Sequence, residues 1–149
     1  PKLVSKLTEN NVEVRLHSKI LNKAKENNSS NLIKLAKKDD WGREFLDLKI
    51  SIKSVKSVEE AISHIDKFSF GHTDGIISKI DKNINKFVQS VNSSAVTVNA
   101  STRFNDGGEI GLGSEIAIST TKVSPRGPLG LEEITTYKWV IEGNGHIRN

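Results

Sequence analysis

Cysteine and methionine are both absent from this chain of 149 residues, and proline occurs only 3 times. Without cysteine the chain cannot form a disulfide framework, the usual support of small secreted domains. No apolar run approaches the roughly 20 residues that a membrane-spanning helix requires, and no leader for secretion is recognisable at the N-terminus. We therefore expect a cytoplasmic protein without membrane contact. Because it opens on Pro1 and lacks methionine, we also expect the chain to be a piece of a longer polypeptide.

Aromatic residues make up only 5% of the chain, although 22 basic residues stand against 18 acidic ones. A basic excess raises the question of nucleic-acid binding. The lysines, however, alternate with polar and acidic residues, and base stacking needs aromatic platforms that are scarce here. A solvated, lysine-rich surface is therefore the preferred interpretation, with no nucleic-acid partner. A nucleic-acid-binding domain is the weakest alternative.

Apolar residues recur along the chain with the spacing of strands and helices in turn. Strands are expected over 12–16, 48–52, 76–77 and 95–98. Helices are expected around Leu3 and after the capping residues Ser18, Ser57 and Asp81. This alternation predicts the α/β class, a layered sheet of parallel neighbours with flanking helices. The β-forming residues of 135–141 predict a further strand near the C-terminus.

The stretch from Val96 to Glu115 runs from an apolar strand into polar, glycine-rich chain. Amide, hydroxyl and guanidinium groups occur there within five residues, on Asn99, Ser101, Thr102 and Arg103. Backbone N–H groups can approach a ligand closely at Gly107, Gly108, Gly111 and Gly113. We expect this loop to bind an anion; the alternative is that its glycines only serve tight turns with positive φ. It is not a dinucleotide fingerprint, because Ile116 takes the place of the last glycine, and no P-loop sequence occurs.

Arg103 and Arg126 are the candidates for holding a carboxylate or phosphate group. A guanidinium group donates two parallel hydrogen bonds to such groups, which an ammonium group cannot do. Either arginine could instead join loops by donating to backbone carbonyls. No metal site is expected, because His64 and His72 lack further ligands at metal-binding spacing. We interpret His72 and Asp74 as part of a hydrogen-bond cluster at the end of a helix.

Two sets of short motifs resemble one enzyme family. The first set is 99–104 (NASTRF), 106–108 (DGG), 111–113 (GLG), 118–120 (IST), 126–128 (RGP) and 136–138 (TYK). The second is Val55, 61–65 (AISHI), 72–74 (HTD) and Ile76. In order and spacing they resemble the C-terminal third of gamma-glutamyl phosphate reductase, also called glutamate-5-semialdehyde dehydrogenase, of the aldehyde dehydrogenase superfamily. The resemblance runs from about Trp41 to Arg148 and is weak before Trp41. The chain departs from the family in having Ser124 and Pro125 where His-Ala usually precedes Arg126.

The resemblance implies the catalytic-domain fold of an aldehyde dehydrogenase with a C-terminal strand extension. It implies that residues 1–128 are a substrate-side α/β domain, incomplete at its N-terminus, and that residues 129–149 are a strand extension for contact with another domain or subunit. The implied partners are the remainder of the same polypeptide, with a Rossmann-like half and a Cys-bearing segment, and further copies in a homo-oligomer.

The implied reaction is the NADPH-dependent conversion of L-glutamate 5-phosphate to L-glutamate 5-semialdehyde in proline biosynthesis, through a cysteine thioester. No catalytic residue is expected in this chain, because it contains no cysteine, and the chain alone is expected to be inactive. Glu44 resembles the superfamily's glutamate that hydrogen-bonds the cofactor ribose; an exposed loop carboxylate is the alternative. The implied substrate-binding residues are Asn99, Ser101, Thr102, Arg103, Gly107, Gly108 and Arg126.

A non-catalytic binding module, which kept the fold and lost the nucleophile, is the alternative from another functional class. The sequence does not decide between NADP and NAD as cofactor. It also does not separate a stand-alone reductase from one that is fused to glutamate kinase.

Overall fold

The computed structural model describes residues 1–113, 115–118, 125–144 and 147. By their contacts these residues form two compact units, which we describe one at a time. The first unit is Pro1–Phe70 with Ser78–Asn92, and the second is Gly71–Ile77 with Ser93–Asn149. Within the described ranges, no helix is long and apolar enough to cross a membrane.

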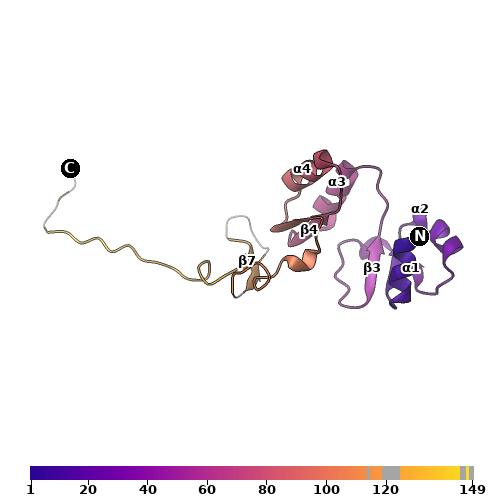
Figure 1. The fold of residues 1–149 in the computed structure, drawn as a ribbon, viewed down its shortest axis with the longest axis horizontal. Coiled ribbons are helices and arrows are strands. Elements are labelled where there is room, and N and C mark those ends of the chain that lie inside the picture. The colour runs from indigo at the N-terminus through magenta and orange to yellow at the C-terminus, as the bar shows by residue number, and fades with distance from the viewer. Residues whose placement is uncertain (114, 119–124, 145–146, 148–149) are drawn as a thin grey trace. The chain divides into compact units, whose positions relative to one another are not determined.

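A parallel sheet with one apolar face organises the first unit. Its strands are β1 (Glu13–Leu16), β2 (Ile33–Leu35) and β3 (Lys49–Ile52), in the order β2-β1-β3. Val14 and Leu16 point to one face of the central strand and are 0% exposed, because alternate residues of a strand face the same side. Helices α1 (Lys2–Glu9) and α2 (Ser18–Asn27) belong to this unit (Figure 1). The core comprises Val4, Val14, Leu16, Ala24 and Ile33, with Leu7, Ile20, Leu21 and Ile52 packed against it.

The opposite face of this sheet carries polar residues. Glu13 and Arg15 alternate with the buried Val14 and Leu16, so their side chains leave the other side of β1. In the parallel register Arg15 lies beside Lys34 of β2 and Ser51 of β3. The chain between β2 and β3, including the short 3₁₀ helix η1 (Lys38–Asp40), supplies the acidic partner of Arg15.

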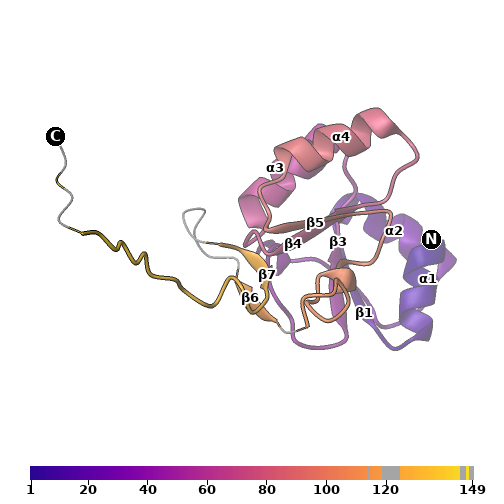
Figure 2. The same ribbon diagram turned by 60° about the vertical axis from the view of Figure 1, so that its left-hand side comes forward.

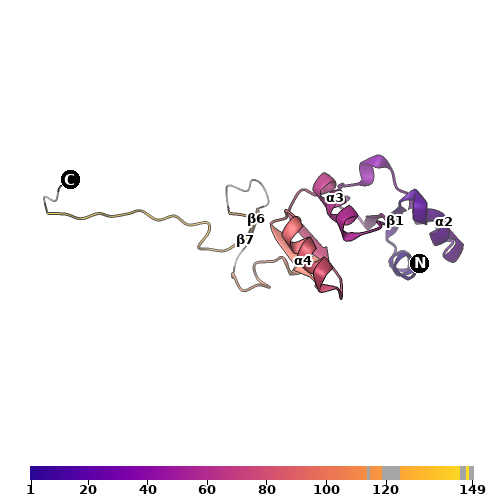
Figure 3. The same ribbon diagram turned by 90° about the horizontal axis from the view of Figure 1, so that it is seen from above.

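Helices α3 (Val58–Phe68) and α4 (Asp81–Ser90) lie side by side in the first unit (Figures 2 and 3). Ser57 is the N-cap of α3, and its hydroxyl accepts a hydrogen bond from the Glu60 N–H at 3.3 Å, as predicted. The other two predicted caps are wrong by one position. His17 caps α2 in place of Ser18, and Asp81 is the first residue of α4, whose N-cap Ile80 makes no side-chain hydrogen bond.

The second unit contains a parallel pair of strands and an antiparallel pair. Strands β4 (Thr73–Ile76) and β5 (Ala95–Val98) are parallel, with Gly75 opposite Thr97. The short 3₁₀ helix η2 (Thr102–Phe104) follows β5. Strands β6 (Ile116–Ile118) and β7 (Gly127–Leu129) are antiparallel neighbours (Figure 2). Sequence patterns did not predict β6, β7 or the three-residue β2.

The predicted strand over 135–141 is wrong for this chain by itself. These residues run in an extended form without strand pairing, drawn in yellow in Figure 1. Their side chains are strongly exposed, with Trp139 at 84% and Ile141 at 93%. β-forming residues define a strand only when a neighbouring backbone supplies the hydrogen bonds, and the chain supplies none here within the described residues.

The predicted α/β class is confirmed, since parallel strands and helices alternate along the first 98 residues. The two units are not divided at residue 128. The prediction assigns residues 1–128 to a substrate-side domain and residues 129–149 to an extension that contacts another domain or subunit. These roles depend on contacts with another domain or subunit, so this division stays a prediction.

Candidate functional site

The polar loop begins where the parallel pair of the second unit ends. Asn99 follows the last residue of β5, and its N–H donates to the Ile76 carbonyl at the corresponding end of β4, at 2.8 Å. Asn99 has a φ of 54°, a left-handed conformation that asparagine tolerates better than most residues. This turn directs the chain away from the strand pair. The loop therefore starts at the carboxyl ends of parallel strands, the edge where α/β sheets commonly bind ligands.

Ser101 fixes the short helix that carries Thr102 and Arg103. Its hydroxyl oxygen accepts a hydrogen bond from the Arg103 N–H at 3.2 Å, and its carbonyl accepts one from the Phe104 N–H at 3.1 Å. A hydroxyl that accepts one hydrogen bond can still donate its own proton. Thr102 packs toward the strands instead: its Cγ2 lies 3.3 Å from the position that a Cβ of Gly75 would take.

The loop lines a cavity of about 330 Å³, which is formed by Ser101, Arg103, Phe104, Asp106 and Glu109. Of the predicted substrate-binding residues, the structure thus brings Ser101 and Arg103 together. The cavity holds one guanidinium group and two carboxylates. An anion must therefore be held by directed hydrogen bonds rather than by a general positive potential, and a zwitterion suits the mixture better than a simple anion does.

The backbone donors of Gly107 and Gly108 already have acceptors from the same loop. The Gly107 N–H donates to a carboxylate oxygen of Glu115 at 2.9 Å. The Gly108 and Glu109 N–H groups donate to Oδ1 of Asp106 at 2.8 and 3.1 Å. The anions that these backbone N–H groups bind are carboxylates of the protein itself. A direct role of Gly107 and Gly108 toward substrate stays a prediction.

At Gly111 and Gly113, the backbone conformation of a tight turn accounts for the presence of glycine. Gly111 and Gly113 have φ values of 85° and 70°, which L-residues adopt only at a cost. Arg126 immediately precedes β7 and is half-buried; whether it contacts substrate stays a prediction. Ser119, Thr120 and Ser124, which belong to the motifs quoted above or flank them, lie outside the described residues.

Hydrogen bonds also connect the loop to the start of β4. The Asn105 side-chain amide donates to the Thr73 hydroxyl at 2.6 Å, and Nδ1 of His72 lies 2.6 Å from the same oxygen. The Ser93 hydroxyl donates to Asp74. The predicted cluster around His72 and Asp74 therefore exists, but it lies at the first residues of a strand and not at a helix end. Among the described residues, no group of three or more His, Cys, Asp or Glu side chains is placed to hold a metal ion.

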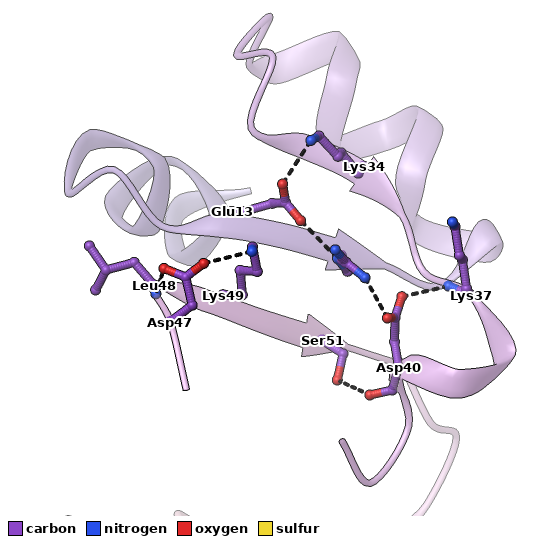
Figure 4. A network of polar contacts seen from close by, with 9 residues as sticks. Glu13, Lys34, Lys37, Asp40, Asp47, Leu48, Lys49 and Ser51 are labelled. Carbon is purple, nitrogen blue, oxygen red and sulfur yellow. Dashed lines mark hydrogen bonds and ion pairs between the residues drawn. The ribbon is translucent and has the colours of Figure 1, made fainter. Parts of the chain in front are cut away.

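Glu44 lies in the first unit, on the loop between η1 and β3. It is exposed and, within the described part of the chain, its carboxylate makes no hydrogen bond or ion pair. Its neighbours are well anchored. Asp40 is 1% exposed and accepts a hydrogen bond from Nη1 of Arg15 at 2.5 Å and one from the Lys37 N–H at 2.7 Å. Figure 4 shows this network on the polar face of the sheet.

Arg15 forms ion pairs with two carboxylates of this network, those of Glu13 and Asp40. Burial by itself would raise the pKa of Asp40, but the hydrogen bonds from the Lys37 N–H and the Arg15 guanidinium outweigh it and hold this pKa below its ordinary value. Hydrogen bonds from Lys34 and Arg15 lower the pKa of Glu13. Both carboxylates are therefore ionised at neutral pH, and Arg15 remains charged between them.

Sequence reasoning missed several of these residues. Asp106 and Glu109 stood beside the quoted glycines, and the carboxylate of the DGG motif was a usable signal that a turn was capped. The alternation of Glu13 and Arg15 also predicts their common face. Nothing in the sequence pairs Arg15 with Asp40, because 25 positions separate them and only the tertiary fold brings them together.

Comparison with known proteins extends the resemblance to the whole chain, including the first 40 residues where the motifs were weak. No protein-family model matches. A gamma-glutamyl phosphate reductase of Clostridium botulinum is 49% identical over 99% of this chain, and one of Legionella pneumophila is 46% identical over 100% of it. The crystal structure of gamma-glutamyl phosphate reductase from Thermotoga maritima matches 100% of the chain with a TM-score of 0.84 and 47% identity. These matches cover 34–36% of the relatives' own lengths. Over its whole length, the chain is therefore homologous to about one third of gamma-glutamyl phosphate reductase.

Proposed function

We propose that this chain is the substrate-side third of an NADPH-dependent reductase that converts L-glutamate 5-phosphate to L-glutamate 5-semialdehyde for proline biosynthesis. The observation that carries the proposal is the 49% identity to a gamma-glutamyl phosphate reductase over 99% of the chain. The remainder of the enzyme, with the nucleophilic cysteine and a nucleotide-binding half, belongs to the rest of the polypeptide.

The mixed charge of the loop cavity supports an amino-acid substrate. Glutamate 5-phosphate carries carboxylate and phosphate groups together with an ammonium group. Arg103 and the Ser101 hydroxyl are donors for the anionic groups, whereas Asp106 and Glu109 are acceptors for the ammonium group. Asn99, Gly107, Gly108 and Arg126 complete the proposed polar wall, and Thr102 supports it from the side that packs toward the strands.

Glu44 is the proposed contact to the cofactor. An exposed carboxylate suits a ribose diol, because its two oxygens can accept both hydroxyl protons. When bound, NADPH supplies the hydride for the reduction. The buried and hydrogen-bonded Asp40, four positions before Glu44, anchors the loop that carries this carboxylate.

The proposed reaction needs one nucleophile from outside this chain. A cysteine thiolate attacks the acyl phosphate carbon and expels phosphate, which gives a thioester. Hydride transfer to the thioester carbon then expels the thiolate and leaves the semialdehyde. In these steps the residues of this chain bind and orient the substrate. The 149-residue chain by itself is accordingly expected to oxidise no NADPH in the presence of glutamyl phosphate.

A steady-state comparison in the full-length enzyme tests the assignment of the loop. Arg103→Gln should raise the KM for glutamate 5-phosphate about tenfold or more, since a charge-assisted hydrogen bond is lost. Lys79→Gln removes the same charge from an exposed site elsewhere and serves as the control. The KM for NADPH and the melting temperature should change little in both variants. A lower melting temperature with an unchanged KM would make Arg103 a structural tie, and absence of reductase activity in the full-length protein would favour the non-catalytic module.

A further inference from the structure

Arg15 contacts the residues on both sides of Glu44. Its Nη1 atom lies 2.5 Å from Oδ1 of Asp40, four positions before Glu44. Its guanidinium carbon lies 5.2 Å from the centroid of the Phe45 ring, immediately after Glu44, within the range of a cation–π contact. One side chain from the central strand thus contacts both ends of the loop segment 40–45.

Arg15 is itself held in place from the sheet. Its Nε atom donates to Glu13 at 2.8 Å, and Glu13 also forms an ion pair with Lys34 at 2.7 Å (Figure 4). Glu13, Arg15 and Lys34 belong to adjacent parallel strands. The guanidinium therefore has a fixed origin and direction, which a long flexible side chain on a helix surface would lack.

Two further contacts limit the movement of the loop. Gly42 has a φ of 76°, and a Cβ at this position would lie 2.4 Å from the Phe68 carbonyl oxygen at the end of α3, so the loop approaches that helix closely. Arg43 lies over the Phe45 ring as well, at 5.6 Å from its centroid. The ring is thus contacted by two guanidinium groups. The backbone at Glu44 is fixed from three directions, although its carboxylate is exposed.

We infer that Arg15, acting through Asp40 and Phe45, is a positioning residue that fixes the direction of the Glu44 carboxylate for binding of the nicotinamide cofactor. This inference rests on the cofactor role proposed for Glu44. Arg15 touches neither substrate nor cofactor in this scheme. Its function is to make the loop rigid before the nucleotide arrives, so that binding does not have to order the loop.

The test uses the full-length enzyme and the dissociation constant for NADPH, measured by nucleotide fluorescence in the absence of substrate. Phe45→Leu keeps an apolar side chain but removes the ring beneath Arg15, and should weaken NADPH binding about tenfold, as expected for misplacement of a binding group. Arg15→Lys keeps the charge beside Asp40 but loses the planar contact, and should act in the same direction. Lys86→Gln breaks an exposed ion pair with Glu59, which involves none of the residues that hold Arg15 or the loop, and is the control.

A double-mutant cycle separates positioning from a general structural role. In the Glu44→Gln background, Phe45→Leu should weaken NADPH binding no further, because the group that it positions is already lost. Hydrogen exchange over residues 40–46 should rise in Phe45→Leu and in Arg15→Lys but not in Lys86→Gln. If Glu44→Gln weakens binding and Phe45→Leu does not, or if their effects add, the inference about Arg15 is wrong while the role of Glu44 stands. If Glu44→Gln leaves NADPH binding unchanged, the cofactor role of Glu44 and the inference built on it both fail.

Discussion

At the scale of single residues, several side-chain carboxylates of this chain accept hydrogen bonds from backbone N–H groups in turns. Asp40 accepts from the Lys37 N–H, Asp106 from two N–H groups of the glycine-rich loop, and Glu60 from the Lys56 N–H at 2.9 Å. Short polar side chains commonly take this role in turns, where the backbone lacks helix or sheet partners. Hydrogen bonds between their own side chains and backbone therefore stabilise the loops that carry the proposed binding groups. Removal of a single carboxylate should make such a loop more flexible.

Asp40→Asn is expected to remove a pH-dependent part of the stability. The folded-state pKa of Asp40 lies below its ordinary value, so its contribution is present above the unfolded-state pKa of about 3.9 and is lost as the pH falls through the folded value. At pH 7 the variant should unfold with about 3 kcal/mol less free energy, as for a broken buried ion pair. Urea denaturation of the full-length protein should show this gap closing below about pH 4.

The control for this experiment is Asp39→Asn, which removes an exposed carboxylate one position away. Its free energy of unfolding should stay within about 0.5 kcal/mol of wild type at every pH. If the Asp40→Asn gap is the same at pH 7 and at pH 3, the ion pair with Arg15 contributes no charge-dependent stability.

Gly42 and Gly111 offer a matched pair for separating backbone strain from steric conflict. Both have positive φ, at 76° and 85°, but a Cβ on Gly42 would meet the Phe68 carbonyl oxygen, whereas one on Gly111 would have nothing within 4 Å. Gly111→Ala should therefore cost about 1 kcal/mol through its left-handed conformation. Gly42→Ala should cost about 3 kcal/mol, because the loop must also move away from α3. Equal losses in denaturation experiments would argue against the close approach of this loop to the helix.

At the scale of elements, the sequence predicted the helices and strands that are long enough for their apolar residues to recur with a regular spacing. Three of the four predicted strands in the parallel sheets were placed within one or two residues, and Ala95–Val98 matches in full. The fourth, expected at 76–77, begins earlier, because Gly75 weakens the apolar signal of Thr73–Ile76. Strands of three residues, such as Ile33–Leu35 and Gly127–Leu129, are too short to show alternation. Helix caps were predicted from residue type, which does not say whether the side chain reaches a free N–H.

The caps of α3 and α4 should differ in their contribution to stability. Ser57→Ala removes the acceptor of the Glu60 N–H at the start of α3 and should cost about 1 kcal/mol. Asp81→Ala removes only a charge from the first turn of α4, because Asp81 is not the cap, and should cost about 0.5 kcal/mol or less. Both variants concern exposed positions of neighbouring helices, so thermal denaturation compares them directly. A larger loss for Asp81→Ala would restore Asp81 as the capping residue.

At the scale of the whole molecule, sequence reasoning located the candidate site but not its internal contacts. The polar run from Asn99 to Arg103 was found because it follows a clearly apolar strand, and the structure gathers Ser101 and Arg103 around one cavity. It does not group Thr102 with them, because Thr102 packs over Gly75. The acceptors that occupy the Gly107 and Gly108 N–H groups depend on turns that residue order alone does not specify. The predicted strand over 135–141 does not form because, within the described residues, no neighbouring backbone pairs with it.

The extended segment 135–141 is expected to pair with the edge of a sheet in another subunit. Tyr137, Trp139 and Ile141 lie on one face of an extended chain, and they are 80%, 84% and 93% exposed; an exposed apolar face of this kind favours an interface, and an unpaired extended backbone can add to a sheet edge. In the full-length protein, Trp139→Glu should shift the oligomer toward smaller species in light-scattering measurements, because it places a charge on this face. Thr136→Glu adds the same charge to the opposite face and should leave the assembly largely intact. If both variants, and a chain that ends at Ile134, keep the wild-type mass at micromolar concentration, the segment is no oligomerisation strand.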